Sequence, residues 1–160
     1  MASNRDLSTL LASTAHRTGE LLKIIVAFRR LLEAHDAVAA LRSIEEILIN
    51  VIGTEDFVIL LITDEVTLRA VAGTGPAATR AQHEPPTLDD LHGTHARVIP
   101  LYISENVVGA IVIEQLLPQR DPLNASDDQV LSLLSRFGAS AVMAAAHRKS
   151  WTRLTISELS

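Results

Sequence analysis

The apolar residues at the start of the chain recur every three or four positions, which is the spacing of one side of an α-helix. This pattern predicts a long amphipathic helix from Asp6 to about Glu33, with Thr14 and Thr18 at two positions of the apolar row. A row of this width suits a helical bundle better than a strict two-stranded coiled coil. Its main apolar members are Leu7, Leu11, Leu21, Ile25, Phe28 and Leu32.

A second helix and a buried strand are expected next. Asp36 is of the residue type that caps a helix N-terminus, and Gly53 is of the type that ends a helix. Apolar residues between them again have helical spacing, so we expect the second helix to run through Ile52. Residues 55–63 are almost continuously apolar, which indicates a strand that is covered on both faces.

Two hairpins separated by a loop follow in the predicted order. A short turn is expected at Asp64-Glu65. Residues 66–72 then alternate between apolar and polar and are expected to pair with the preceding strand. Residues 73–94 collect glycines and prolines, so we expect a loop with at most one helical turn at 88–91. Residues 96–103 and 107–116 predict the second hairpin.

The last helix has a start signal in the sequence. Ser126 is a favourable N-cap residue, and Gln129 stands three positions later, which is the spacing of a capping box. We expect this helix to run to about Lys149, and residues 151–160 to form a less ordered tail. One row of the helix comprises Val130, Leu134, Phe137, Ala141 and Ala144.

This order of elements predicts the α+β class. We expect an antiparallel sheet of four to six strands, with the long N-terminal and C-terminal helices packed on one face. The chain of 160 residues has the length of one domain. Residues 1–34 would form the N-terminal amphipathic helix, residues 35–150 the domain that ends in the long C-terminal helix, and residues 151–160 the tail.

The second predicted hairpin resembles the late hairpin of GAF domains. Ile99-Pro100-Leu101 matches the apolar-Pro-Leu strand of that hairpin, and Val108-Gly109-Ala110 matches its apolar-Gly-apolar strand, before an acid-capped terminal helix. The order of elements also agrees over about Leu32 to His147. PAS and roadblock-type domains are the competing folds, and the helix after the last strand favours GAF over PAS.

The resemblance implies either a ligand sensor or a dimerising signalling module. GAF domains bind cyclic nucleotides, tetrapyrroles, haem or other small metabolites, or they dimerise through bundles of their terminal helices. In ligand-binding members the segment between the hairpins adds helices and a strand over the pocket, whereas here it is compressed to about Gly73–His95. The Asn-Lys-Phe-Asp-Glu signature of cyclic-nucleotide members is also absent, and we expect no cofactor.

Composition excludes several classes of function. The chain has no cysteine, which removes disulfides, thiolate nucleophiles, Cys-ligated zinc and thioether-linked pigments. Its net charge is −5 and its basic residues are scattered, so we expect no nucleic-acid binding. We see neither a signal-peptide pattern nor a run of ~18 apolar residues, so we expect a cytoplasmic protein without membrane insertion.

The candidates for chemistry are weak. His92 and His95, with His83 and an acidic neighbourhood of Glu84, Asp89 and Asp90, have a metal-like composition. Zinc needs three or four convergent ligands, so we expect solvated loop histidines and no metal site. Gly73-Thr74-Gly75-Pro76 lacks the Lys-Ser/Thr of a phosphate loop. We find no combination of acid, base and nucleophile, so we expect no catalytic residues and no enzyme activity.

The sequence therefore favours a non-catalytic GAF-like signalling or adaptor domain that acts through homodimerisation and protein–protein interaction. The alternative is a sensor domain that binds a small ligand between the sheet and the 73–95 loop. The predicted dimer interface comprises Leu7, Leu11, Leu21, Ile25, Phe28, Leu32, Val130, Leu134, Phe137, Ala141 and Ala144.

Overall fold

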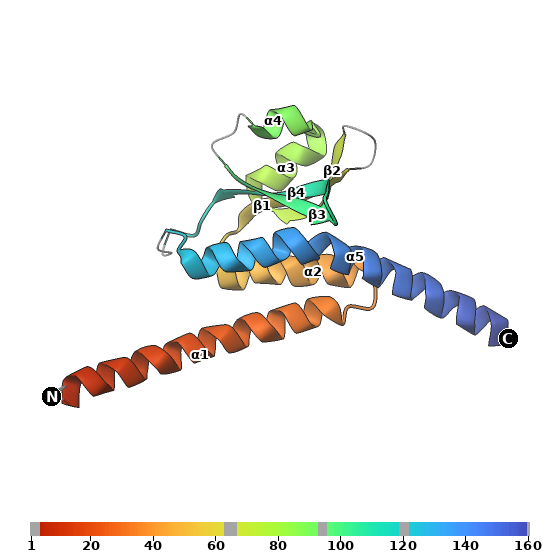
Figure 1. Cartoon of the computed structure of the whole chain (residues 1–160). Coiled ribbons are helices and arrows are strands. Elements are labelled where there is room, and N and C mark those ends of the chain that lie inside the picture. Colours follow the sequence, from red (N-terminus) through yellow and green to blue (C-terminus); the bar gives the residue numbers. More distant parts are fainter. Residues whose placement is uncertain (1–3, 63–66, 93–95, 119–121, 160) are drawn as a thin grey trace.

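The computed structural model describes residues 4–62, 67–92, 96–118 and 122–159. In it, a four-stranded antiparallel sheet lies between helices on both of its faces (Figure 1). The elements are α1 (Asn4–Leu32), α2 (Ala37–Ile47), η1 (Leu48–Ile52), β1 (Asp56–Ile62), β2 (Leu68–Thr74), α3 (Gly75–His83), α4 (Leu88–His92), β3 (Arg97–Ile103), β4 (Asn106–Gln115) and α5 (Ala125–Leu159).

The first two helices form as the sequence predicts. Asp36 caps α2, because its Oδ1 accepts a hydrogen bond of 2.8 Å from the Ala39 backbone N–H. The helix continues through Ile52, and its last five residues form the π-helical turn η1. Gly53 ends it with φ of 83°, a left-handed conformation that glycine adopts without a steric penalty.

The sheet has the strand order β2-β1-β4-β3, so β1 and β4 are its central pair. Both predicted hairpins are present, and the turn expected at residues 64–65 lies outside the described residues. Alternate residues of a strand face opposite sides of a sheet. Phe57 and Ile59 of β1 belong to one buried cluster, while Val58 and Leu60 belong to another on the opposite face.

The helices α2 and α5 pack against one face of the sheet, and α1 packs on α2 and α5 on their far side (Figure 1). The last turns of α1 take part in this core, where the Leu31 side chain is fully buried. The N-terminal part of α1 and the C-terminal part of α5 extend past the sheet at opposite ends of the molecule. Thus α1 forms a third layer that covers helices rather than strands.

The other face of the sheet is covered by α3, which the sequence analysis missed. Residues 75–83 form a helix of nine residues where we expected a loop, and the terminal helices are not the only cover of the sheet. The short helix α4 confirms the single helical turn predicted at 88–91. Because both faces of β1 and β4 are apolar, a second helical cover removes from water the side chains that a loose loop would leave exposed.

The C-terminal helix α5 begins and ends differently from the prediction. Its capping box uses Asn124 and Asp127, each of which donates its backbone N–H to the other's side chain, at 2.9 and 3.0 Å. The predicted box at Ser126 is therefore misplaced by two residues. The helix also continues to Leu159, so its predicted end at about Lys149 is wrong by ten residues.

One stretch of α5 bears on the expectation about membranes. Over Ala125–Arg148 this helix is long and apolar enough to cross a membrane by length and composition, and it is the one such helix in the described part of the chain. However, 44% of its most apolar 18-residue window is buried inside the protein, and Leu134 is fully buried. The buried residues of this stretch, among them Val130 and Leu131, belong to the main core cluster.

The glycine of the GAF-like hairpin motif is required by backbone packing, which gives a testable prediction. A Cβ atom at Gly109 would lie 2.1 Å from the carbonyl oxygen of Leu60 on the neighbouring strand. We expect Gly109→Ala to lower the free energy of unfolding by at least ~1–3 kcal/mol, the scale of overpacking, in urea denaturation.

Gly19→Ala is the matched control, because a Cβ there would have no atom within 4 Å. We expect it to raise stability by up to ~1 kcal/mol through helix propensity. Equal unfolding midpoints for the two variants would contradict the packing argument.

Candidate functional site

The predicted interface residues of α5 divide between the core and the surface. Val130, Leu134 and Ala141 are only 2%, 0% and 5% exposed, because they pack in the protomer's own core. These three residues are therefore not available to a second protomer, and their inclusion in the interface was wrong. Phe137 and Ala144 are exposed on the outer side of α5.

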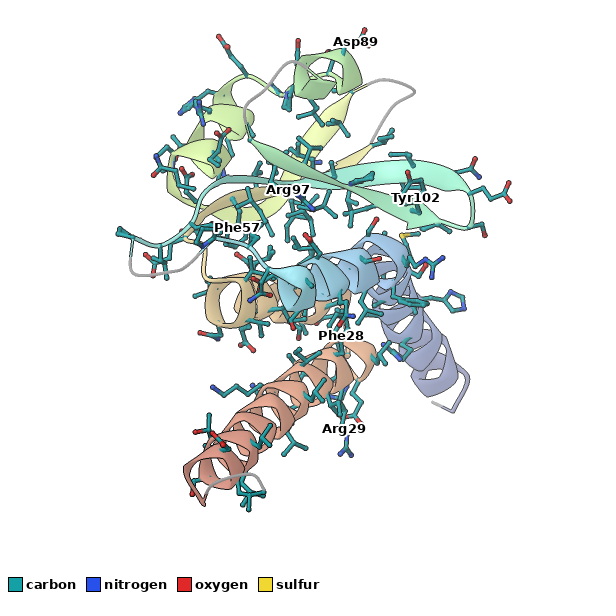
Figure 2. The ribbon with its side chains drawn as sticks, turned by 60° about the vertical axis from the view of Figure 1, so that its left-hand side comes forward. Phe28, Arg29, Phe57, Asp89, Arg97 and Tyr102 are labelled. Carbon is teal, nitrogen blue, oxygen red and sulfur yellow. The ribbon has the colours of Figure 1, made fainter. Side chains whose placement is uncertain are left out.

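The predicted interface residues of α1 are mostly exposed. Five of them are at least 50% exposed, and they lie along one side of the helix; we call them the α1 row. Phe28 differs, because it is partly buried and directed toward the layer of α2 and α5, whereas the neighbouring Arg29 points away from it (Figure 2). The α1 row comprises Leu7, Leu11, Leu21, Ile25 and Leu32.

The α1 row lies beside the buried side of the helix, not on it. Ile24, Phe28 and Leu31 face the protomer core, and at 3.6 residues per turn the row follows about a quarter turn further around α1. On the far margin of the row, Arg29 Nε lies 3.0 Å from Glu33 Oε1, and this hydrogen bond raises the pKa of Arg29. The row itself carries no charged residue.

A second candidate site is a cavity of about 370 Å³ on the opposite face of the sheet, under α3 and α4. Its apolar floor and walls come from β1, β4 and the two short helices, so it lies between the sheet and the 73–95 segment, where the sequence analysis placed the alternative ligand site. The helical spacing of two alanines, at 77 and 81, was the available signal for α3. The apolar lining comprises Val58, Leu60, Ala77, Ala81, Pro86, Leu91 and Val112.

The rim of the cavity is polar and charged. Arg80 on α3 and Glu114 on β4 form an ion pair, with Nη2 and Oε1 3.0 Å apart. Asp90 accepts a hydrogen bond of 2.8 Å from the Thr87 backbone N–H in the cap of α4, and this bond lowers the pKa of the Asp90 carboxyl. His83 and Glu84 complete the ionisable groups among the described lining residues.

The position of α3 over the sheet is fixed at its first turn. Asp56 at the start of β1 accepts a hydrogen bond of 2.9 Å from the Ala77 backbone N–H, which leaves this helix capped by a residue from another element. Gly75 has φ of 79°, and a Cβ there would lie 2.7 Å from the Glu55 carbonyl oxygen. The helix therefore begins directly against the backbone of β1.

The end of β2 is also held from the helical side of the sheet. The Gly73 backbone N–H hydrogen-bonds to the Glu45 carboxylate on α2, which opposes the effect of burial on that group. Burial is the larger effect, and the pKa of Glu45 is raised. The segment from Gly73 to Ala77 is thus held by polar contacts from α2, through Glu45, and from β1, through Asp56.

The histidine cluster gives no metal site that the structure can describe. Within the described ranges, no group of three or more His, Cys, Asp or Glu residues could hold a metal ion. His95 and the side chain of His92 lie outside the part that is described, so the prediction of solvated loop histidines stays a prediction.

Comparisons with known proteins do not assign the chain to a family. No protein-family model matches it, and no curated protein matches its sequence significantly. The function must therefore be argued from the α1 row and the cavity.

The cap of α3 gives a second prediction. We expect Asp56→Ala to accelerate amide hydrogen exchange in residues 77–83 and to lower stability by ~1 kcal/mol, the usual cost of losing a cap. Glu55→Ala is the control, because this neighbouring side chain is exposed. Unchanged exchange in α3 of the Asp56 variant would show that the cap does not hold the helix.

Proposed function

We propose that this chain is a non-catalytic signalling or adaptor domain of GAF-like architecture that acts as a homodimer. The observation that carries this proposal is the exposed α1 row. The row has exposed leucines at 7 and 11 and a second exposed group at Leu21, Ile25 and Leu32. Monomeric proteins rarely expose large apolar patches to water. The surfaces that stay exposed in the dimer would then contact a partner protein.

Two features favour a second copy of the chain as the occupant of the α1 row. An interface with two-fold symmetry places the same surface of both protomers in contact, so it must be compatible with itself. An uncharged row meets this condition, because no like charges are brought together. The outer side of α5 adds further exposed apolar side chains, among them Leu133, Phe137 and Met143.

The GAF-like assignment is supported by the order of elements and by the late hairpin. The four-stranded antiparallel sheet, the helix after its last strand and the long helices at both ends agree with the resemblance. The need for glycine at position 109 gives a physical reason for the apolar-Gly-apolar pattern of the motif.

The dimer predicts a specific effect of charge on the α1 row. Ile25→Glu places a carboxylate on a side chain that is 60% exposed in the protomer, so the protomer should still fold. In the dimer this charge would be buried without a partner, which is strongly unfavourable. We expect light scattering at micromolar concentration to show a dimer for the unaltered chain and a monomer for Ile25→Glu, with equal helix content by circular dichroism.

Ala12→Glu is the control, because this exposed residue lies on a different side of α1. It should remain dimeric. A monomeric unaltered chain would refute the dimer, as would a monomeric Ala12→Glu variant together with an unaffected Ile25→Glu variant. Leu134→Asp is unsuitable as a test, because Leu134 is fully buried in the protomer core.

A second candidate function is that of a small-molecule sensor, and the cavity under α3 favours it. Its volume of about 370 Å³ lies within the range of ~300–1000 Å³ that is usual for ligand pockets. An apolar interior with polar groups at the rim is also typical of such pockets.

A cavity-filling variant tests the sensor. We expect a thermal-shift screen of metabolites to yield a ligand that stabilises the protein by ~2.7 kcal/mol at 100 times its dissociation constant. The stabilisation should be lost in Leu91→Trp, which fills the cavity, and kept in Val38→Trp, whose side chain is exposed on α2. A ligand that stabilises both variants equally would bind elsewhere.

A further inference from the structure

The lining of the cavity under α3 indicates the chemical class of its ligand. We infer that it takes a small amphiphilic cation, in which a short aliphatic or single-ring body carries a protonated amine. This inference rests on the proposed sensor function. It concerns what the site selects, whereas the sensor proposal concerns whether the site binds any small ligand.

The interior of the cavity accounts for the apolar body. Val58, Leu60 and Val112 from the central strands form its floor, and they are buried against α3 through small alanine side chains. The apolar side chains of Pro86 and Leu91 in the lining are only partly buried, so an apolar body placed against them removes apolar surface from water. The cavity volume of about 370 Å³ is at the lower end of the usual range, so the body must be short.

The rim accounts for the positive charge. Among the described lining residues, three carboxylates, those of Glu84, Asp90 and Glu114, stand against one guanidinium, that of Arg80, and one imidazole, that of His83. The guanidinium is already paired with Glu114 at 3.0 Å. An anionic ligand would have to compete with Glu114 for Arg80 and approach two further carboxylates.

A cation meets no such competition. It can approach Glu84 and Asp90 while the pair between Arg80 and Glu114 stays intact, and hydrogen bonds from Thr87 lower the pKa of the Asp90 carboxyl. The described lining contains no aromatic side chain, so a cation–π contact is not available there. Carboxylates are therefore the groups that would recognise the amine.

Three probes with the same apolar body test the charge preference: hexylamine, hexanol and hexanoate. Binding is followed by the methyl NMR signals of Val58, Leu60 and Val112, which report on the cavity itself. We expect hexylamine to bind about five- to tenfold more tightly than hexanoate, with hexanol between them, because exposed ion pairs are individually weak.

A charge-neutral variant separates recognition from structure. Glu84→Gln should weaken hexylamine binding about two- to fivefold and leave hexanol binding unchanged. Glu105→Gln, in the exposed turn between β3 and β4, should change neither affinity. An equal loss for hexylamine and hexanol in the Glu84 variant would overturn the role of this carboxylate in recognition.

The outcomes distinguish the inference from the sensor function on which it rests. If hexanoate shifts the cavity methyl signals as strongly as hexylamine or more strongly, the cation inference is overturned and the sensor function stands. If none of the three probes shifts these signals at millimolar concentration, both the inference and a sensor for ligands of this size are overturned.

Discussion

The close pairing of β4 with β1 is the contact on which the other layers of the molecule depend. At Gly109 the two backbones approach so closely that a single methyl group would collide with the carbonyl oxygen of Leu60. Because this pair lies at the centre of the sheet, its alternate residues face two different layers. Phe57 and Ile59 need a cover on one face, and Val58 and Leu60 need one on the other.

The helices on the two faces of the sheet cover it with side chains of different size. On one face, large side chains of α2 and α5, such as Ile44 and Leu134, fill the space above the strands. On the other face, α3 contributes alanines, which let the helix approach the sheet but fill little volume. A cavity at the edge of this cover is the result. In the third layer, α1 has more apolar surface than α2 and α5 can cover, so part of its apolar surface stays exposed.

Signals within short stretches of sequence predicted most of the helices and strands. Contacts between residues far apart in the sequence determined α3 and the burial of each helix side. The cap at Asp36 and both hairpins depend on neighbouring residues, so the sequence reveals them. The cap of α3 comes from Asp56, about twenty residues away, while Gly75 and Pro76 locally suggest a loop. Helical spacing likewise shows which residues share a side but not what covers it. It could not distinguish buried Leu134 from exposed Ile25, nor show that small alanines leave a cavity.

The sheet connects the two proposed sites physically, because β1 takes part in both environments. Val58 and Leu60 line the cavity, and the alternate residues Phe57 and Ile59 pack in the core beneath α2 and α5, on which α1 lies. Protein interiors are close-packed, so a shift of β1 at the cavity must be accommodated in the helical layer. Any coupling through this strand would be reciprocal: a ligand that favours the dimer would bind the dimer more tightly, by the same factor. The cavity lies on one face of the sheet, and the exposed surface of α1 lies beyond the helices on the other face. Strand β1 is thus placed to couple ligand binding to dimer formation.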